Sequence, residues 1–540
     1  YKEKLRFNWN TPIHASPTQK GTIYMGAQFL FRSRDKGDTW ERISPDLTTN
    51  DPEKQKQELS GGITVDNSSA EMHTTVYSIS ESPLDSKVIW IGTDDGNVQL
   101  TRDGGKSWTN LARNIKDLPP GSWVSWVEAG HFAPGAAYAA IDRHTFGDMT
   151  PWVYRTLDFG KTWSRIVGPE QGVRGYAHVI KEDAVKRELL FCGTELGLWI
   201  SVDAGKSWAE FKGGDFPSVA VRDLQIHPRE QDLVIATHGR GIWIVDDIAP
   251  LRSLSSEALG REVAFLPGRP VQQRMEARGG WSEGDASFIG QNPPTGAMIS
   301  YYQSARHLYG PIQLEVLDAQ GKTVTTLPAS RRRGLNRTVW SMFTKAPRVP
   351  PAVHVAFNAS RGPRVLPGIY TVRLTKGSTK IETKLEVRLD SRAPYNEADR
   401  KAQFEVAMRA SELFNDMSTL IERIDQARKA AEARAKELPA QDELGNKVRA
   451  LANNLEKLRK EIVATQEGGA ITGEERIREH TDIVYGALMG WEGRPARYQV
   501  ERVNALRREL DAVKSEFEGL LVQQVRRLDD ELRSRKLQPI

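Results

Sequence analysis

The stretch TRDGGKSW, Thr101 to Trp108, is one of four near-copies of a single pattern in this chain. The other copies are SRDKGDTW at 33–40, TLDFGKTW at 156–163 and SVDAGKSW at 201–208. All four read Ser/Thr-x-Asp-x-Gly-x-x-Trp, and their starts lie 68, 55 and 45 residues apart. Repeats of this length, with room for loop insertions, are typical of the blades of a β-propeller.

Each residue type in the pattern has a structural use in a tight turn between two strands. Glycine accepts a positive φ, and the aspartate carboxylate accepts backbone N–H bonds across the turn. The Ser/Thr hydroxyl adds a local hydrogen bond, and the tryptophan packs beneath the hairpin. We therefore predict a structural and not a catalytic role for Ser33, Asp35, Gly37, Trp40, Thr101, Asp103, Gly105, Trp108, Thr156, Asp158, Gly160, Trp163, Ser201, Asp203, Gly205 and Trp208.

The residues around each turn predict a blade of short antiparallel strands. Around the second copy, VYSISESP (76–83), VIWIGT (88–93) and VQLT (98–101) are rich in Val, Ile and aromatic residues and are separated by Gly/Asp turns. A fifth copy, LVIATHGRGIWIVDD (233–247), keeps the strands but lacks the Asp turn. Five blades could close a ring alone. Because the chain begins at Tyr1 without Met or a signal peptide, we expect further blades on a preceding region or on another chain.

The whole sequence predicts a mainly β protein with an α-helical C-terminal region. We assign residues 1–250 to the propeller, 251–262 to a linker, 263–392 to an Ig-like β-sandwich and 393–540 to an antiparallel helical bundle or coiled-coil hairpin. The sandwich is indicated by alternating runs and by the hairpin signals DAQGK and KGSTK. The helices are indicated by heptad stripes, such as the apolar positions of 444–462 and 503–520. These stripes either pack on one another or dock a partner.

Composition excludes several classes of function. The formal charge of +5 comes from 75 basic and 70 acidic residues that are interleaved along the chain, so nothing points to nucleic acid. The single cysteine, Cys192, excludes an internal disulfide framework. The ten histidines show no metal-ligand spacing, and we find no phosphate-binding glycine loop and no Gly-x-Ser-x-Gly elbow. No run approaches the roughly 20 apolar residues of a membrane span. We therefore predict no metal and no cofactor.

The repeated turn is identified as the Asp-box, or BNR repeat, of sialidases, some two-propeller glycoside hydrolases and the sortilin/VPS10 receptors. The whole chain resembles the C-terminal half of large exported bacterial proteins described as sortilin-like or as BNR-repeat "glycosyl hydrolase" proteins. Segments that carry this resemblance include ISPDLTTND (43–51) and ATHGRGIWIVDDIAPLR (236–252). The resemblance implies export from a bacterial cell and a preceding propeller region as a partner. A hydrolase name that rests on a shared fold is weak support for activity.

An enzyme of this class needs particular side chains. A sialidase needs three arginines for the substrate carboxylate, and only Arg222 and Arg240 suggest themselves. A glycosidase needs two carboxylates that face each other across the sugar. The candidates for catalysis are Glu71, Glu128, Asp142 and Asp223, with Asp94, Asp95 and Glu195 also near inner turns. The sequence does not tell which of them face one another.

A binding surface is the prediction that we prefer. The longest insertions, 48–75 and 142–152, are loops on a rigid scaffold, where propellers carry binding residues. The candidate binding residues are Trp123, Trp126, Trp152, His238 and Arg240. We predict an exported, non-enzymatic scaffold or receptor-like module that binds protein or glycan within a larger assembly. The alternatives are a glycoside hydrolase acting in a cleft between two propellers, and an assembly factor for another envelope protein. The helical tail could also support a homo-oligomer.

Overall fold

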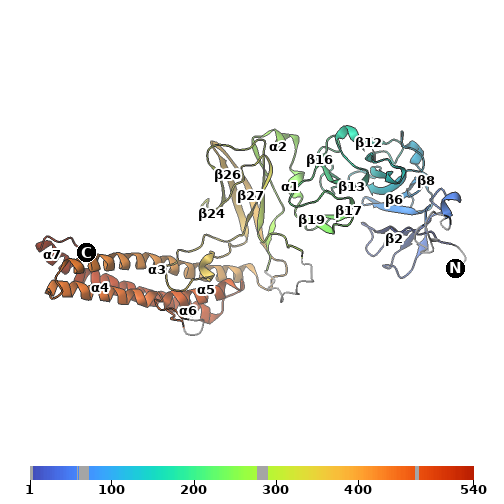
Figure 1. The fold of residues 1–540 in the computed structure, drawn as a ribbon. Helices are drawn as coiled ribbons and strands as arrows, with labels where there is room; N and C mark the ends of the chain where they lie inside the picture. Colours follow the sequence, from blue (N-terminus) through green and yellow to red (C-terminus); the bar gives the residue numbers. More distant parts are fainter. Residues whose placement is uncertain (1–3, 57–58, 60–71, 276–289, 469–472) are drawn as a thin grey trace. The chain divides into compact units, whose positions relative to one another are not determined.

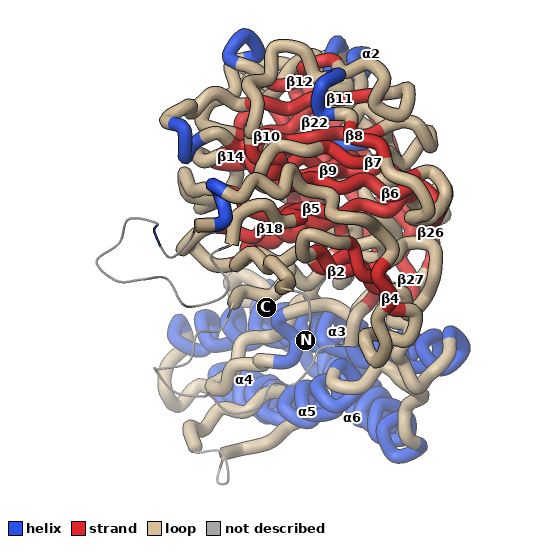
Figure 2. The backbone as a smooth tube through the Cα atoms, turned by 90° about the vertical axis from the view of Figure 1, so that its right-hand side faces the viewer, coloured by secondary structure: helices blue, strands red, loops and turns tan. Residues whose placement is uncertain are grey.

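The computed structural model of this protein describes residues 4–56, 59, 72–275, 290–468 and 473–540. The chain divides into two compact units, Tyr1–Gly268 and Arg269–Ile540. The regular structure of the first unit is mainly strands, and the long helices all belong to the second (Figure 1, Figure 2). The predicted class, mainly β with an α-helical C-terminal region, is confirmed.

The first unit is a row of antiparallel sheets in which neighbouring strands in the sequence are neighbours in space. Four of these blades have four strands and the fifth has three. The blades are β1 (Ile13–Ala15), β2 (Ile23–Gly26), β3 (Leu30–Ser33) and β4 (Glu41–Arg42); β5 (Val76–Ser82), β6 (Asp85–Thr93), β7 (Val98–Thr101) and β8 (Thr109–Asn110); β9 (Trp123–Ala129), β10 (Ala137–Asp142), β11 (Trp152–Thr156) and β12 (Ser164–Val167); β13 (Ala177–Glu182), β14 (Leu190–Thr194), β15 (Gly197–Ser201) and β16 (Ala209–Glu210); and β17 (Val221–Ile226), β18 (Leu233–Thr237) and β19 (Ile242–Val245).

The first strand of each blade is its inner strand, and consecutive inner strands pack together: β1 on β5, β5 on β9, β9 on β13 and β13 on β17. Since each blade is an antiparallel meander, the inner strands start at the same end as the loops that join blades. We call this side the loop end. The repeated Asp turns lie at the other side, the Asp-box end, where the inner strands finish.

The Asp turn explains why each blade's third strand can reverse so sharply. In the second blade, Asp103 Oδ1 accepts hydrogen bonds from the Thr101 hydroxyl (2.8 Å) and the Ser107 N–H (2.9 Å). The Thr101 hydroxyl in turn accepts the Gly105 N–H at 3.0 Å. Gly105 has a φ of +103°, which a residue with a Cβ adopts only with strain. The carboxylate and hydroxyl together close the turn.

The tryptophans of two Asp turns reach the blade before their own. Trp108 Nε1 donates to the carbonyl of Ile43 at 3.2 Å, and Trp208 Nε1 donates to the carbonyl of Ile166 at 2.9 Å. Each bond runs from one blade to the segment at the outer edge of the preceding blade. The Asp turn therefore joins neighbouring blades as well as closing its own hairpin.

Short helical turns lie in the connecting segments. They are η1 (Glu53–Gln55), η3 (Ala112–Asn114), η4 (His144–Phe146) and η5 (Pro169–Gln171) in the propeller, followed after the fifth blade by α1 (Ala249–Arg252), α2 (Ser256–Gly260) and the strand β20 (Val263–Leu266). Arg252 of α1 makes a bidentate contact with the buried carboxylate of Asp183, at 2.8 and 2.9 Å. This contact fixes α1 on the fourth blade.

The second unit begins with β-structure. A five-stranded sheet has the order β21-β27-β26-β23-β24, and β22 pairs antiparallel with β25 in another sheet. These strands are β21 (Val271–Gln273), β22 (Ala297–Gln303), β23 (Ile312–Leu317), β24 (Thr323–Leu327), β25 (Gly334–Trp340), β26 (Gly368–Lys376) and β27 (Thr379–Leu389), with η6 (Asn358–Ser360) before β26. That this region has an Ig-like topology stays a prediction.

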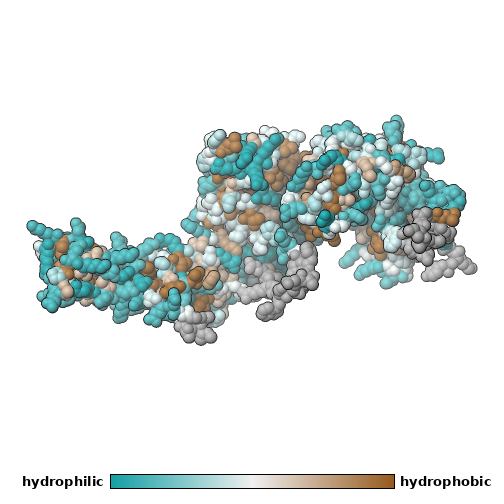
Figure 3. All heavy atoms as spheres, in the orientation of Figure 1, coloured by the Kyte–Doolittle hydropathy of each residue, from teal (hydrophilic) through white to brown (hydrophobic). Residues whose placement is uncertain are grey.

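The helices of the second unit share one hydrophobic core. They are α3 (Glu397–Glu437), α4 (Glu443–Ile462), α5 (Ile477–Met489), α6 (Arg497–Leu520) and α7 (Arg526–Ser534), with a π-helical turn, η7 (Leu521–Val525), before α7. The six stripe residues of α4 are all buried in that core: Leu444, Val448, Leu451, Leu455, Leu458 and Ile462. The predicted stripes therefore pack on one another, while the outer face of the helices in view is mostly hydrophilic (Figure 3). A coiled-coil geometry stays a prediction.

Candidate functional site

A cluster of histidine, aromatic and charged side chains lies at the loop end of the second, third, fourth and fifth blades. Its centre is Asp142, the buried last residue of β10. Asp142 Oδ2 accepts from His178 Nδ1 at 3.0 Å, and Oδ1 accepts from the N–H of His144 at 3.0 Å and from its Nδ1 at 2.5 Å. One carboxylate thus orients two imidazole rings from different blades. We call this group the loop-end cluster.

The protonation states in the loop-end cluster follow from burial and hydrogen bonding. Burial opposes ionisation of Asp142, but hydrogen bonds from His178 and His144 outweigh it and hold the pKa of Asp142 below its usual 3.8. Burial lowers the pKa of His178 below 6.5, against the opposing effect of Asp142. A neutral His178 that donates Nδ1–H to Asp142 keeps its lone pair on Nε2. The 3.1 Å contact between Arg222 and His178 Nδ1 is then no hydrogen bond, and Arg222 acts on Asp142 as an ion pair at 3.8 Å.

Aromatic rings surround these polar groups. The Tyr77 and Trp123 rings meet edge to face with centroids 4.6 Å apart, and the His144 ring stacks on Tyr176, also at 4.6 Å. Arg222 Nη2 donates to the Tyr176 hydroxyl at 3.2 Å. The cluster offers aromatic faces, a guanidinium and an oriented imidazole. Such an arrangement is suited to binding a ligand.

Acidification is expected to destabilise the propeller through this cluster. Since the pKa of His178 is lower in the folded than in the unfolded chain, the unfolded chain binds more protons below pH 6.5, and stability falls as pH falls. We expect the urea concentration at the unfolding midpoint of the first unit to be lower at about pH 5.5 than at about pH 7.5. The variant His178→Gln should show a shallower drop. Part of it should persist because burial also lowers the pKa of His14, and an unchanged slope would remove His178 from this account.

A second cluster, of carboxylates, lies at the Asp-box end of the inner strands. Glu128 is buried and pairs with Lys181 at 2.9 Å, and it also contacts His131 Nε2 at 3.4 Å. Glu182 accepts the His131 N–H at 2.6 Å and the Tyr138 hydroxyl at 2.7 Å. Burial raises the pKa of Glu182. Burial acts in the same sense on Glu128, but Lys181 and His131 together outweigh it and lower the pKa of Glu128.

The predicted catalytic carboxylates do not form one group. Glu128 belongs to the carboxylate cluster and Asp142 to the loop-end cluster, at opposite ends of the inner strands. Asp223 is partly exposed and accepts from Gln225 at 3.1 Å. Burial raises its pKa, and the charges of Lys181 and Glu128 in the carboxylate cluster act on it as well. Glu71 lies outside the described residues. The buried oxygens of Glu128 and Asp142 are already occupied by protein donors.

The predicted binding residues are also dispersed. Only Trp123 belongs to the loop-end cluster. Trp126 is partly buried between blades, and its Nε1 donates to Glu128 at 3.3 Å. Trp152 is held by Asp148 at 3.1 Å and is covered by the Arg165 guanidinium, 3.9 Å from the ring centroid. His238 and Arg240 are exposed in the turn between β18 and β19.

Sequence reasoning missed four members of the loop-end cluster. Tyr77 and His178 are second residues of inner strands, Tyr176 directly precedes one, and His144 follows a second strand. The signal that could have found them is this shared place in the blade repeat, because equivalent positions in successive blades meet at one end of the ring.

Within the ranges that the structure describes, no group of three or more His, Cys, Asp or Glu is arranged to hold a metal ion. Among the same residues, no helix has both the length and the apolar character needed to cross a membrane.

Comparison with known proteins agrees with the Asp turns. Residues 152–256 match the Sortilin-Vps10 family model, described as sortilin, neurotensin receptor 3. Over 126 residues the chain is 25% identical to vacuolar protein sorting/targeting protein 10 of Aspergillus flavus, and equally to that of Aspergillus oryzae. The match covers 22% of this chain and 8% of the fungal proteins, so the chain spans less than a tenth of the relatives' length.

The chain also has some likeness to solved structures. A GH74 xyloglucanase from Xanthomonas campestris is 11% identical with a TM-score of 0.33, over 70% of this chain and 52% of that one. YCF48 from Cyanidioschyzon merolae is 15% identical with a TM-score of 0.31, over 50% and 73% of the two chains. The predicted resemblance to the Asp-box propellers of the sortilin/Vps10 type is confirmed by the family-model match.

Proposed function

We propose that this chain is a non-enzymatic β-propeller scaffold or receptor-like module of an exported protein, which binds a partner protein as part of a larger assembly. The observation that carries this proposal is an apolar face of the fifth blade that no following blade covers within the part of the chain that the structure describes. It consists of Val234 and Ala236 of β18 with Ile242 and Ile244 of β19, and we call it the uncovered face. Ile242 is 73% exposed and Ile244 is 57% exposed.

The fourth blade supports this proposal because the fifth blade covers its equivalent face. The two blades share one register across their second and third strands. The equivalent pairs are Phe191–Ile200 with Val234–Ile244, and Gly193–Leu198 with Ala236–Ile242. Phe191 and Leu198 are fully buried in a core that includes Val221 of the fifth blade. Leaving a comparable face in water is unfavourable by about 25 cal/mol per Å² of apolar surface.

The occupant that fits the uncovered face is a further propeller blade with a β-branched residue on its inner strand. Three blade junctions in this chain place a valine against a glycine of the preceding blade. These pairs are Val76 on Gly26, Val124 on Gly92 and Val221 on Gly193. Ala236 stands at the position equivalent to Gly193. The partner is then another propeller region, either of the same precursor or of another envelope protein.

Site-specific photo-cross-linking tests the proposal. With p-benzoylphenylalanine in place of Ile242 or Ile244, irradiation of cells that make the chain should yield adducts whose attached peptides come from propeller strands. The same label in place of Leu84, on the second blade and 47% exposed, is the matched control and should give no such adduct. Adducts from neither position, or equal labelling from all three, would contradict the proposal. Cell fractionation tests the export.

The carboxylates of Glu128 and Glu182 favour a second candidate function, that of a glycoside hydrolase. The pKa of Glu128 is lowered and that of Glu182 raised, and both carboxylates contact His131. Two carboxyl groups with divergent pKa values are what a glycosidase needs. Cleavage of a β-glucan that the variant Glu182→Gln abolishes without loss of folding would replace the scaffold proposal.

A further inference from the structure

The second unit contains a pocket of about 670 Å³ between its β-structure and its helices. Four arginines line it, Arg361, Arg364, Arg392 and Arg400, together with the carboxylate of Glu492. Arg361 lies over the Phe343 ring, 4.4 Å from its centroid, and Arg392 is paired with Asp390 at 2.7 Å. The other two, Arg364 and Arg400, share the one carboxylate of Glu492.

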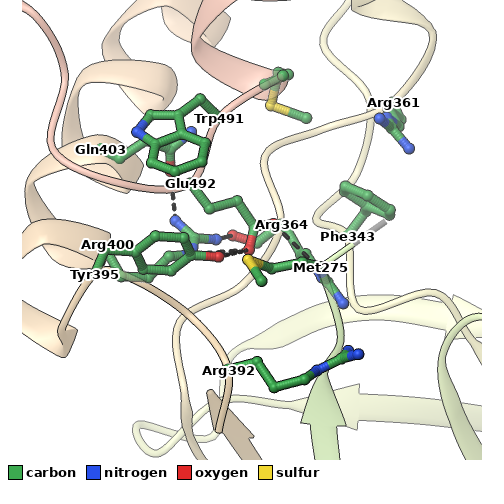
Figure 4. Close-up of a pocket in the computed structure, with 12 residues that line it drawn as sticks. Met275, Phe343, Arg361, Arg364, Arg392, Tyr395, Arg400, Gln403, Trp491 and Glu492 are labelled. Atoms are coloured by element: carbon green, nitrogen blue, oxygen red, sulfur yellow. Dashed lines mark hydrogen bonds and ion pairs between the residues drawn. The ribbon is translucent and has the colours of Figure 1, made fainter. Parts of the chain in front are cut away.

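Two of these arginines are buried around Glu492. The Arg364 side chain is 6% exposed, and its Nη1 lies 3.1 Å from Glu492 Oε1. The Arg400 side chain is 1% exposed, and its Nε lies 3.8 Å from Oε2. The Tyr395 hydroxyl donates to the same Oε2 at 3.2 Å. Figure 4 shows these side chains converging on the carboxylate from the sheet side and from the start of α3.

Only one of the three guanidinium nitrogens of Arg364 makes hydrogen bonds. Its Nη1 donates to Glu492 and to the carbonyl of Arg274, both at 3.1 Å. Its Nε and Nη2 are buried and have no hydrogen-bond partner among the residues that the structure describes. Leaving such donors unsatisfied in the interior costs about 1–3 kcal/mol each, and more for a charged group. A buried charge excess and two unmet donors on one residue together point to a ligand.

The two unmet donors have a specific geometry. Nε–H and Nη2–H lie along one edge of the planar guanidinium and point in parallel, as a fork that fits two oxygens of a carboxylate or phosphate. Trp491, 52% exposed, and Tyr395 meet edge to face at 5.5 Å and give the pocket an aromatic wall. An anion with an organic body would bury that body against these rings.

We propose that this pocket binds an organic oxyanion, a carboxylate or a phosphate ester, through the Nε/Nη2 edge of Arg364 with Arg400 beside it. The anion supplies the acceptors that Glu492 alone cannot provide. The site lies wholly within the second unit and does not depend on the partner proposed for the first. A carboxylated sugar and a phosphorylated metabolite share this chemistry.

Titration calorimetry of the full chain tests the site with inorganic phosphate and with glucuronate as separate probes. We expect saturable binding of at least one probe at millimolar concentration, with the preferred probe telling phosphate from carboxylate. The variant Arg364→Lys keeps the charge but loses the fork, and it should weaken binding at least tenfold. The matched control Arg392→Lys lines the same pocket but is paired with Asp390, and it should change affinity less than twofold.

Two further measurements distinguish loss of binding from loss of folding in the variants. Trp491 fluorescence should change on titration, and circular dichroism should show equal helix content and melting in the wild type and both variants. Absence of saturable binding of both probes to the wild-type chain would overturn the proposal, whatever the variants do. Equal affinity of the wild type and a folded Arg364→Lys would overturn it as well.

Discussion

Replacing Glu128 by alanine is expected to lower the free energy of unfolding of the propeller unit by about 3–5 kcal/mol. The reason is the ion pair with Lys181 at 2.9 Å, in which the carboxylate is 5% and the lysine 17% exposed. Removing the carboxylate leaves a largely buried ammonium without its partner, and that is far more costly than losing a surface pair. Urea denaturation followed by tryptophan fluorescence measures the change.

The control for this prediction is a surface ion pair on the same blade as Lys181. Glu188 pairs with Lys186 at 3.2 Å, with both side chains more than a third exposed, so Glu188→Ala should cost no more than about 1 kcal/mol. The double variant Glu128→Leu/Lys181→Met should recover most of the loss, because an apolar pair needs no charge compensation. If Glu128→Ala and Glu188→Ala lowered the free energy of unfolding equally, the Glu128–Lys181 pair would be accessible to water and the prediction would be wrong.

Replacing Gly193 by alanine is expected to destabilise the propeller by about 1–3 kcal/mol through overpacking. A Cβ at this position would lie 2.5 Å from Val179 Cγ1 and 2.6 Å from Val221 Cγ1, so two blades would have to move apart. The valine variant should cost more than the alanine variant. Thermal and urea unfolding measure both.

The chain supplies its own matched control for the glycine. Ala236 is the equivalent residue of the fifth blade, where no following blade packs, so Ala236→Val should change stability by no more than about 0.5 kcal/mol. If Ala236→Val lowered the stability as much as substitution of Gly193 does, another part of the chain would have to pack on the face that we call uncovered. In an assembly with a partner propeller, the same substitution at Ala236 should become costly, which links this prediction to the cross-linking experiment.

The architecture could be predicted because its signals are local. The Ser/Thr, Asp and Gly of each turn bond to one another within five residues, so the four copies reveal four hairpins without any tertiary information. The heptad stripes are equally local, and the six apolar positions of α4 are buried as their period requires. Burial of a regular stripe follows from helix geometry alone.

The sites could not be predicted because they join distant parts of the chain. Asp142 and His178 are 36 residues apart and come from different blades, and Arg364 and Glu492 are 128 residues apart. Trp126 and Trp152 illustrate a related difficulty. Both are near predicted loops in the sequence, but Trp126 contacts Glu128 while Trp152 lies under Arg165. Which face of a strand a side chain takes depends on register, and register is set by the neighbouring strand.

The tryptophan bonds from one Asp turn to the preceding blade have a consequence for how such proteins change size. Trp108 and Trp208 each reach back by a single blade, so this bond joins a blade to one neighbour only. The bond itself does not depend on how many blades there are. Duplication or loss of a whole repeat at an end of the row would leave the remaining bonds of this kind intact. In such a lineage the number of blades is free to drift.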